Sequence, residues 1–152
     1  MRDDTALDLD NQFCFALYAA SRQVVRAYSE AFKALDLTYP QYLVMLVLWE
    51  WTRDRCERPT VKALGARLDL DSGTLTPLLR RLEAKGVITR QRVSADEREV
   101  FLRVTPAGAR LKQRARRVPM ELLQQSPLPL PHIIKLRDQL KLFRAAPARL
   151  TE

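Results

Sequence analysis

The stretch from Val61 to Val104 constrains the fold of this chain most strongly, because helical and strand patterns follow one another closely within it. Residues 61, 64 and 68 are apolar at the spacing of a short amphipathic helix, which Thr60 precedes as its N-cap. A second helical pattern, 71–86, places four leucines on one face: Leu75, Leu78, Leu79 and Leu82. Two segments with strand character, 87–92 and 99–104, follow. Two helices joined by a tight turn at Asp69–Leu70 and followed by two strands predict a winged helix-turn-helix.

The opposite face of the 71–86 helix is polar and basic, which indicates contact with a polyanion. It carries three small hydroxyl residues and two arginines: Ser72, Thr74, Thr76, Arg80 and Arg81. Small side chains let a helix approach the floor of the DNA major groove, and arginines neutralise phosphates or bind guanine edges. We also predict DNA contacts at Arg90 in the first strand, and at Asp96 and Arg98 between the strands, where an arginine can enter the minor groove. The alternatives are a solvated surface helix and a local salt bridge between Arg98 and Asp96.

The composition fits one globular domain with a polyanionic partner. Lysine and arginine number 26 against 18 acidic residues in 152, a net charge of +8. A basic balance also suits a membrane surface, but several of the arginines lie on the helix and strands described above. The hydrophobic fraction of 47% with 29% charged residues is typical of a globular protein. The uncharged runs 37–49 and 122–134 are too short to cross a bilayer as helices.

The residue types that hold metals are too few and too dispersed for a zinc site. Cys14 and Cys56 lie far apart, and His132 is the single histidine. No nucleotide-binding loop, catalytic triad or pair of catalytic carboxylates stands out, so we expect neither a cofactor nor enzymatic activity. The first residues are polar and lack the apolar run of a signal peptide. We therefore expect a cytoplasmic protein with reduced cysteines.

Helical patterns on both sides of the winged segment predict a dimerisation region. A helix at about 10–35 carries two adjacent apolar stripes, which in so small a chain indicates a subunit interface. Thr38 and Gln41 have capping-box spacing at the start of a helix that runs to Trp51. Beyond Thr105, Pro119 should kink or end one helix, and the proline-rich segment 126–131 should connect it to a last helix at 132–143. We predict one domain over 1–152, a winged segment at about 60–104, and dimerisation helices at about 10–35 and 105–145, with packing of these helices within one chain as the alternative.

The segments 71–86, Asp96-Glu97-Arg98 and Thr105-Pro106-x-Gly108 resemble the MarR family of dimeric regulators. The segments Leu-Asp-Asn-Gln-Phe-Cys-Phe-Ala-Leu-Tyr-Ala-Ala-Ser-Arg (9–22) and Leu-Thr-Tyr-Pro-Gln-Tyr-Leu-Val (37–44) are similar to its organic hydroperoxide resistance branch, OhrR. The wing motif is shared by many MarR proteins, whereas the cysteine with aromatic neighbours is more selective. The resemblance covers residues 9–108 well. It implies a mainly α fold with a small β-wing, a homodimer, and a double-stranded, pseudo-palindromic DNA operator as partner.

The same resemblance implies that Cys14 is a peroxide-reactive sulfur. Tyr28 and Tyr39 match the tyrosines that hydrogen-bond this sulfur from the other subunit, and Tyr18 is a further hydroxyl near it in sequence. Cys14 lies in the first turns of the expected helix, where the macrodipole favours an anionic sulfur, although two nearby aspartates oppose that effect. The alternative is that Cys14 is a small buried hydrophobe and the tyrosines are core or interface aromatics.

These implications predict a repressor that leaves its operator when an organic hydroperoxide oxidises Cys14. No cysteine occurs in 107–152, so a one-cysteine route is expected, through a sulfenic acid to a mixed disulfide with a low-molecular-weight thiol or to a cyclic sulfenamide. Cys56 is then incidental. One alternative is a MarR-type repressor released by a small aromatic ligand. A second is a thiol peroxidase, which the absence of an obvious resolving cysteine disfavours.

Overall fold

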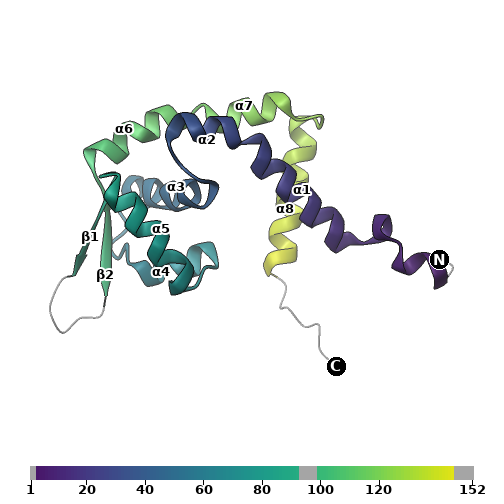
Figure 1. Ribbon diagram of the computed structural model, residues 1–152, viewed down its shortest axis with the longest axis horizontal. Coiled ribbons are helices and arrows are strands. Elements are labelled where there is room, and N and C mark those ends of the chain that lie inside the picture. Colours follow the sequence, from purple (N-terminus) through teal and green to yellow (C-terminus); the bar gives the residue numbers. More distant parts are fainter. Residues whose placement is uncertain (1–2, 93–98, 146–152) are drawn as a thin grey trace. The chain divides into compact units, whose positions relative to one another are not determined.

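The computed structural model describes residues 3–92 and 99–145, and it is mainly helical with one antiparallel pair of strands in that part of the chain (Figure 1). Asp96 and Arg98, which the sequence placed at a DNA contact, lie outside the described residues. The chain forms two compact units, 1–116 and 117–152. Within the described residues, no helix combines the length and the apolar character that a membrane crossing requires.

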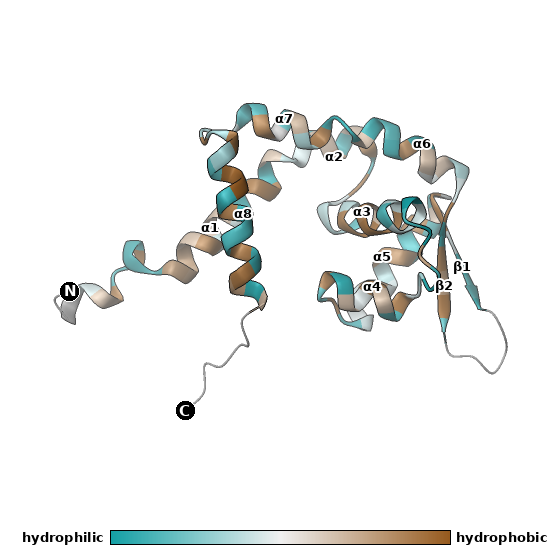
Figure 2. Cartoon of the chain, turned by 180° about the vertical axis from the view of Figure 1, so that it is seen from behind, coloured by the Kyte–Doolittle hydropathy of each residue, from teal (hydrophilic) through white to brown (hydrophobic). Residues whose placement is uncertain are grey.

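The centre of the first unit is a winged helix-turn-helix, as the sequence predicts. Helix α3 (Tyr39–Arg53) packs against α4 (Val61–Leu68) and α5 (Ser72–Ala84), and the strands β1 (Ile88–Arg92) and β2 (Val100–Val104) follow. Figure 2 shows apolar residues concentrated along α3 and β2. The core joins all five elements through fully buried side chains: Met45, Leu48, Leu64, Leu75, Leu79, Leu82, Ile88 and Leu102. Burial of these apolar surfaces fixes α4 and α5 against one support.

Side-chain caps begin these helices where the sequence predicts them. The Thr38 side chain accepts a hydrogen bond from the backbone N–H of Gln41, and the Gln41 side chain accepts one from the backbone N–H of Thr38, so the capping box is complete. Thr60 caps α4, and Asp71 caps α5. Asp69, at the end of α4, has a φ of 58°, the left-handed conformation that turns the chain sharply towards α5.

The wing is a regular two-stranded ribbon with its register fixed by the core. Ile88 lies opposite Val104, and Arg90 lies opposite the buried Leu102. Leu102 also donates its N–H to the carbonyl of Pro59, 2.8 Å away, which ties β2 to the connection before α4. The expected strands 87–92 and 99–104 are confirmed to within one residue at their starts.

The helix expected at about 10–35 is not continuous, and this prediction is wrong. Residues Leu9–Asn11 form a short 3-10 helix, α1 spans Phe13–Ala27, and α2 spans Ser29–Leu35. Gln12 interrupts the start because its extended backbone is held by side-chain donation to the carbonyls of residues 6 and 8. Tyr28 separates α1 from α2, and its ring stacks on Phe32 with centroids 5.0 Å apart.

Helix α6 (Pro106–Ala115) closes the first unit. Thr105 caps it by accepting from the N–H of Gly108, and the indole N–H of Trp49 donates to the Gly108 carbonyl at 3.0 Å. The Trp49 bond holds the first turn of α6 against the winged segment, because its donor comes from α3.

The second unit contains α7 (Val118–Gln125) and α8 (Leu130–Ala145). Pro119 lies in the first turn of α7 rather than at the end of a longer helix, since α6 ends at Ala115. Helix α8 begins two residues before the expected start at 132, because Pro131 is compatible with a first helical turn.

Candidate nucleic-acid interface and sulfur site

The polar face of α5 has the local geometry of a DNA-reading helix. The carboxylate of Asp71 accepts from the backbone N–H of Thr74 at 2.8 Å and from its hydroxyl at 3.1 Å, and these bonds hold the pKa of Asp71 below its usual value. The Thr76 hydroxyl donates to the carbonyl of Ser72 at 2.7 Å. Ser72, Thr74 and Thr76 are all exposed, so these small side chains line the first two turns of the helix.

The two arginines of α5 are available for a partner. Arg80 and Arg81 are exposed, and neither forms a salt bridge within the described residues. The leucines of the opposite face are buried, so the helix divides cleanly between a core face and a basic outer face. This division is the one that the sequence predicts, and it leaves two cations on the outer face of α5.

Arg90 differs from the arginines of α5, because the structure gives it an acidic partner that the sequence did not indicate. Its guanidinium donates to Glu83 Oε2 from Nε at 2.8 Å and from Nη2 at 2.5 Å. The backbone N–H of Arg90 donates to the other oxygen, Oε1, at 3.2 Å. Hydrogen bonding to Arg90 lowers the pKa of Glu83. Acid and arginine stand seven residues apart in a chain rich in both, so no local spacing rule identifies the pair.

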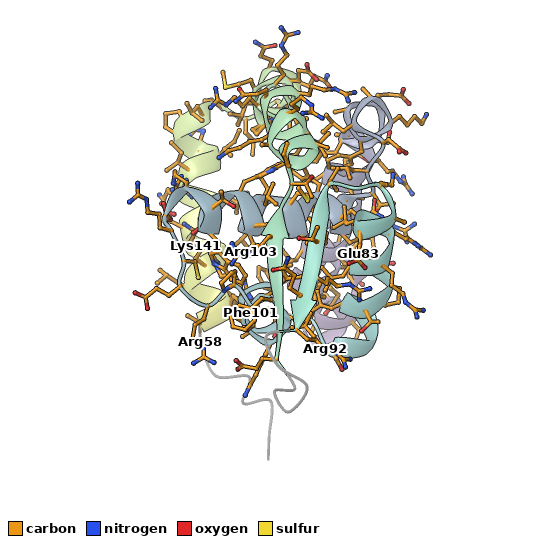
Figure 3. All side chains as sticks on the ribbon, turned by 90° about the vertical axis from the view of Figure 1, so that its left-hand side faces the viewer. Arg58, Glu83, Arg92, Phe101, Arg103 and Lys141 are labelled. Atoms are coloured by element: carbon orange, nitrogen blue, oxygen red, sulfur yellow. The ribbon has the colours of Figure 1, made fainter. Side chains whose placement is uncertain are left out.

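The other side of the ribbon carries a second ion pair, between Arg58 and Glu99. Figure 3 shows Glu83 and Arg58 on opposite sides of the two strands, with Phe101 and Arg103 between them. Cys56 lies in the connection that carries Arg58 and lines a cavity of about 390 Å³. Within the described residues, no group of three or more metal-ligating side chains gathers anywhere.

Cys14 lies in the first turn of α1 and is exposed, rather than buried in the core of its own chain. No residue of α1 is buried, and several large apolar side chains of this helix are exposed: Phe13, Phe15, Tyr18 and Val24. Tyr18 accepts a hydrogen bond from Arg22 at 2.8 Å, and the Arg22 guanidinium also lies 5.4 Å from the Tyr18 ring centroid. Tyr18 is therefore engaged with its own helix rather than with another tyrosine.

Tyr28 and Tyr39 do come together, in an aromatic cluster with Phe32 and Tyr42. The ring centroids of Tyr28 and Tyr39 are 6.0 Å apart, and those of Phe32 and Tyr42 are 5.1 Å apart. Burial and the neighbouring Tyr39 raise the pKa of Tyr28, and burial, with Tyr28 and Tyr39 nearby, raises the pKa of Tyr42 to about 12. At neutral pH both hydroxyls therefore keep their protons and are hydrogen-bond donors.

Sequence reasoning missed Tyr42. The signal was present, since Tyr42 follows Tyr39 by three residues in one helix and must lie on the same side of it. Within the described residues, no hydrogen bond joins Cys14 to any tyrosine of the cluster.

Comparison with known proteins connects these features to one family. Residues 26–115 match the family model described as transcriptional regulator SarA/Rot. The organic hydroperoxide resistance transcriptional regulator of Bacillus subtilis (strain 168) is 48% identical over 117 residues, which cover 77% of this chain and 76% of that protein.

Solved structures of AbfR, a protein of Staphylococcus epidermidis, share the fold. The reduced AbfR bound to DNA is 34% identical with a TM-score of 0.70, over 94% of this chain and 96% of that one. The overoxidized AbfR bound to DNA is 33% identical with a TM-score of 0.68, over 94% of this chain and 99% of that one.

Proposed function

This chain belongs to the SarA/Rot family of MarR-type winged-helix transcriptional regulators, and on that premise we propose that it is a homodimeric repressor that an organic hydroperoxide releases from DNA by oxidising Cys14. The observation that carries the proposal is the similarity to the Bacillus subtilis regulator of organic hydroperoxide resistance, combined with an exposed Cys14 in the first turn of α1. An exposed thiol at the positive end of a helix is accessible to a small oxidant.

DNA binding in this proposal uses the outer face of α5 in the major groove. Ser72, Thr74 and Thr76 allow close approach, and Arg80 and Arg81 contact phosphates or guanine edges. In a two-fold dimer the two recognition helices read half-sites about 34 Å apart, one turn of the duplex. Asp96 and Arg98 belong to the same proposal as contacts of the wing with the minor groove.

The dimer in this proposal is formed by the helices that leave apolar side chains exposed in one chain. Helix α1 has no buried residue, and α8 likewise exposes large apolar side chains along its length: Leu130, Ile134, Leu136 and Leu142. Contiguous apolar surface of this kind is what a subunit interface covers. In this proposal the Tyr28 and Tyr39 hydroxyls of one chain reach the Cys14 sulfur of the partner subunit.

The proposed chemistry consumes one hydroperoxide for each thiol. The Cys14 thiolate attacks the terminal oxygen of ROOH and the O–O bond breaks, giving the sulfenic acid and an alkoxide, which takes up a proton from water to become the alcohol ROH. A low-molecular-weight thiol then condenses with the sulfenic acid, forming a mixed disulfide and releasing water. Tyrosine hydroxyls that remain protonated at neutral pH can donate to the oxidised sulfur.

The test is a titration of DNA binding with cumene hydroperoxide, in wild type, Cys14→Ser and Cys56→Ser. The DNA is a duplex selected by the reduced wild-type protein from a random-sequence library. We expect release from wild type and Cys56→Ser but not from Cys14→Ser, and recovery of binding after addition of a dithiol reductant. Intact-mass measurement identifies the product on Cys14, because each oxidised form changes the mass of the chain by a different amount. Recovery with the reductant separates the reversible forms from the sulfinic and sulfonic acids.

Release of DNA from Cys14→Ser to the same extent as from wild type would refute the proposal. A repressor released by a small aromatic ligand would then be favoured. Steady consumption of hydroperoxide, far beyond one equivalent per subunit, would instead indicate a thiol peroxidase.

A further inference from the structure

Besides the buried core, α5 and the wing are joined by an ion pair between one acid and one arginine, and this pair uses both carboxylate oxygens of the acid. Glu83 in the last turn of α5 accepts through Oε2 from the Nε and Nη2 atoms of Arg90, and through Oε1 from the Arg90 backbone N–H. A bidentate pair of this kind fixes direction as well as distance, since the planar guanidinium must lie in line with the carboxylate. The third bond holds the backbone of β1 itself.

This engagement separates Arg90 from the other arginines nearby. The side chains of Arg90 and Glu83 are 28% and 36% exposed, so the pair is partly withdrawn from solvent. Arg80, Arg81 and Arg92 are exposed, and no salt bridge involves them within the described residues. One of the two edges of the Arg90 guanidinium, formed by Nε and Nη2, is already bound to a carboxylate.

The register of the ribbon carries the effect of this pair beyond β1. Arg90 lies opposite Leu102 of β2, which is buried in the core. Holding Arg90 to Glu83 therefore fixes the ribbon at a set angle to α5. We propose that Glu83 and Arg90 are a positioning pair for DNA recognition: they orient the wing against the recognition helix, and Arg90 does not itself contact DNA. This inference rests on the DNA-binding part of the proposed function.

The physical benefit of such a pair lies in preorganisation. A winged-helix protein engages two elements with one duplex, and a wing that is free to swing must be ordered at the moment of binding. Loss of the pair therefore weakens binding even though no group that touches DNA is removed. A phosphate-binding arginine behaves differently, because its removal also lowers the number of counterions released.

The experiment compares Glu83→Gln, Arg90→Gln, the double variant and the charge swap Glu83→Arg/Arg90→Glu, with Arg92→Gln as a matched control on the same strand. Affinity for a duplex selected by the wild-type protein from a random library is measured between 50 and 200 mM salt. For a partly exposed ion pair we expect each single variant to bind about fivefold more weakly. The salt slope should stay unchanged, the double variant should be no weaker than either single variant, and the swap should recover most of the affinity.

The opposite pattern would overturn the proposal. If Arg90 binds phosphate, Arg90→Gln removes two phosphate contacts from the dimer and lowers the salt slope by about 1.8, and Glu83→Gln tightens binding because it removes a nearby negative charge. The charge swap would then bind weakly, since it places an acid where the DNA requires a cation.

Hydrogen exchange of the β1 amides tests the pair without DNA. Both single variants should exchange faster in β1. The swap should restore protection at the neighbours of residue 90 but not at residue 90 itself, because an arginine at position 83 cannot accept from that backbone N–H. Unchanged exchange in both single variants would refute the positioning role whatever happens to affinity. If the wild-type protein selects no duplex, the proposed function fails, while the exchange measurement still decides whether the pair orients the wing.

Discussion

Replacement of Gly108 by alanine should destabilise this protein strongly, because α6 approaches the winged segment with no room for a side chain. A Cβ atom at this position would lie 2.2 Å from the carbonyl oxygen of Val87 and 2.8 Å from a methyl carbon of Val104. Because the Val87 oxygen is a backbone atom, no side-chain rotation can relieve this clash. The Val87 oxygen also accepts from the Thr105 N–H at 3.1 Å, and a shift of α6 by about 1 Å, enough to restore normal contact, would disturb that bond as well.

The expected magnitude follows from three contributions. Overpacking of this kind costs about 1 to 3 kcal/mol. Moving Gly108 also separates its carbonyl from the buried indole N–H of Trp49, and an unpaired buried donor costs about 1 to 3 kcal/mol. Alanine in place of glycine within a helix stabilises the folded state by about 1 kcal/mol, which offsets part of this loss. The net loss should be about 3 kcal/mol in the free energy of unfolding, which for a chain of this size corresponds to a melting temperature about 10 °C lower.

Urea unfolding followed by far-ultraviolet circular dichroism measures this loss, and the Gly73→Ala variant is the matched control. At Gly73 the atom nearest to a new Cβ is the side-chain oxygen Oδ1 of Asp71 at 3.0 Å, which needs to move by only a few tenths of an ångström. The resulting weakening of its bond to the Thr74 N–H opposes the gain from the better helix former. Gly73→Ala should therefore change the free energy of unfolding by less than about 1 kcal/mol. Equal midpoints for wild type and Gly108→Ala, or an equal loss in both alanine variants, would refute the packing argument.

Two further predictions concern α5. Hydrogen bonds to Thr74 lower the pKa of Asp71 in the folded state, so the ionised cap stabilises the fold above the unfolded pKa near 4, and this stabilisation is lost as the pH falls through the lower folded pKa. Asp71→Asn should therefore be less stable than wild type at pH 7. A difference in stability that does not shrink towards pH 2 would contradict this reasoning. Pro77 lies inside α5 and has no backbone N–H to donate to the Gly73 carbonyl, so Pro77→Ala should raise the free energy of unfolding by about 2 kcal/mol in the same urea assay. A loss of stability in this variant would show that the proline is required for packing.

The winged segment could be predicted from the sequence because its signals are local. Thr60, Asp71 and Thr105 each stand one residue before a helix and accept from a backbone N–H three residues on. Such caps depend on spacing alone. The leucine face of α5 could be predicted equally well, since the fixed period of a helix places its four leucines on one side, which must be the buried side.

Pairings between distant residues could not be predicted in this way. Glu83 and Arg90 stand on different elements, and with 26 basic and 18 acidic residues many pairings were equally compatible with the sequence. The interruption at Tyr28 was missed for a related reason. The Tyr28 ring stacks on Phe32, and its centroid lies 6.3 Å from that of Tyr42, so the break accompanies an aromatic cluster to which α2 and α3 both contribute. Helical periodicity describes a single helix and therefore does not indicate such a cluster.

The junction between α2 and α3 joins the aromatic cluster to the end of α5, and this contact bears on the proposed release from DNA. Lys85, the residue after α5, donates Nζ to the backbone carbonyl of Asp36 and lies 2.7 Å from its Oδ2. Arg114 of α6 donates to the carbonyl of Ala34. Both cations therefore hold the C-terminal end of α2, the helix that carries Phe32 of the cluster. A rearrangement that shifts α2 must either break these contacts or move Lys85 with it. Because Lys85 continues directly from α5, a change at the tyrosines can be transmitted to α5 through this contact, in addition to the direct packing of α3 on α5.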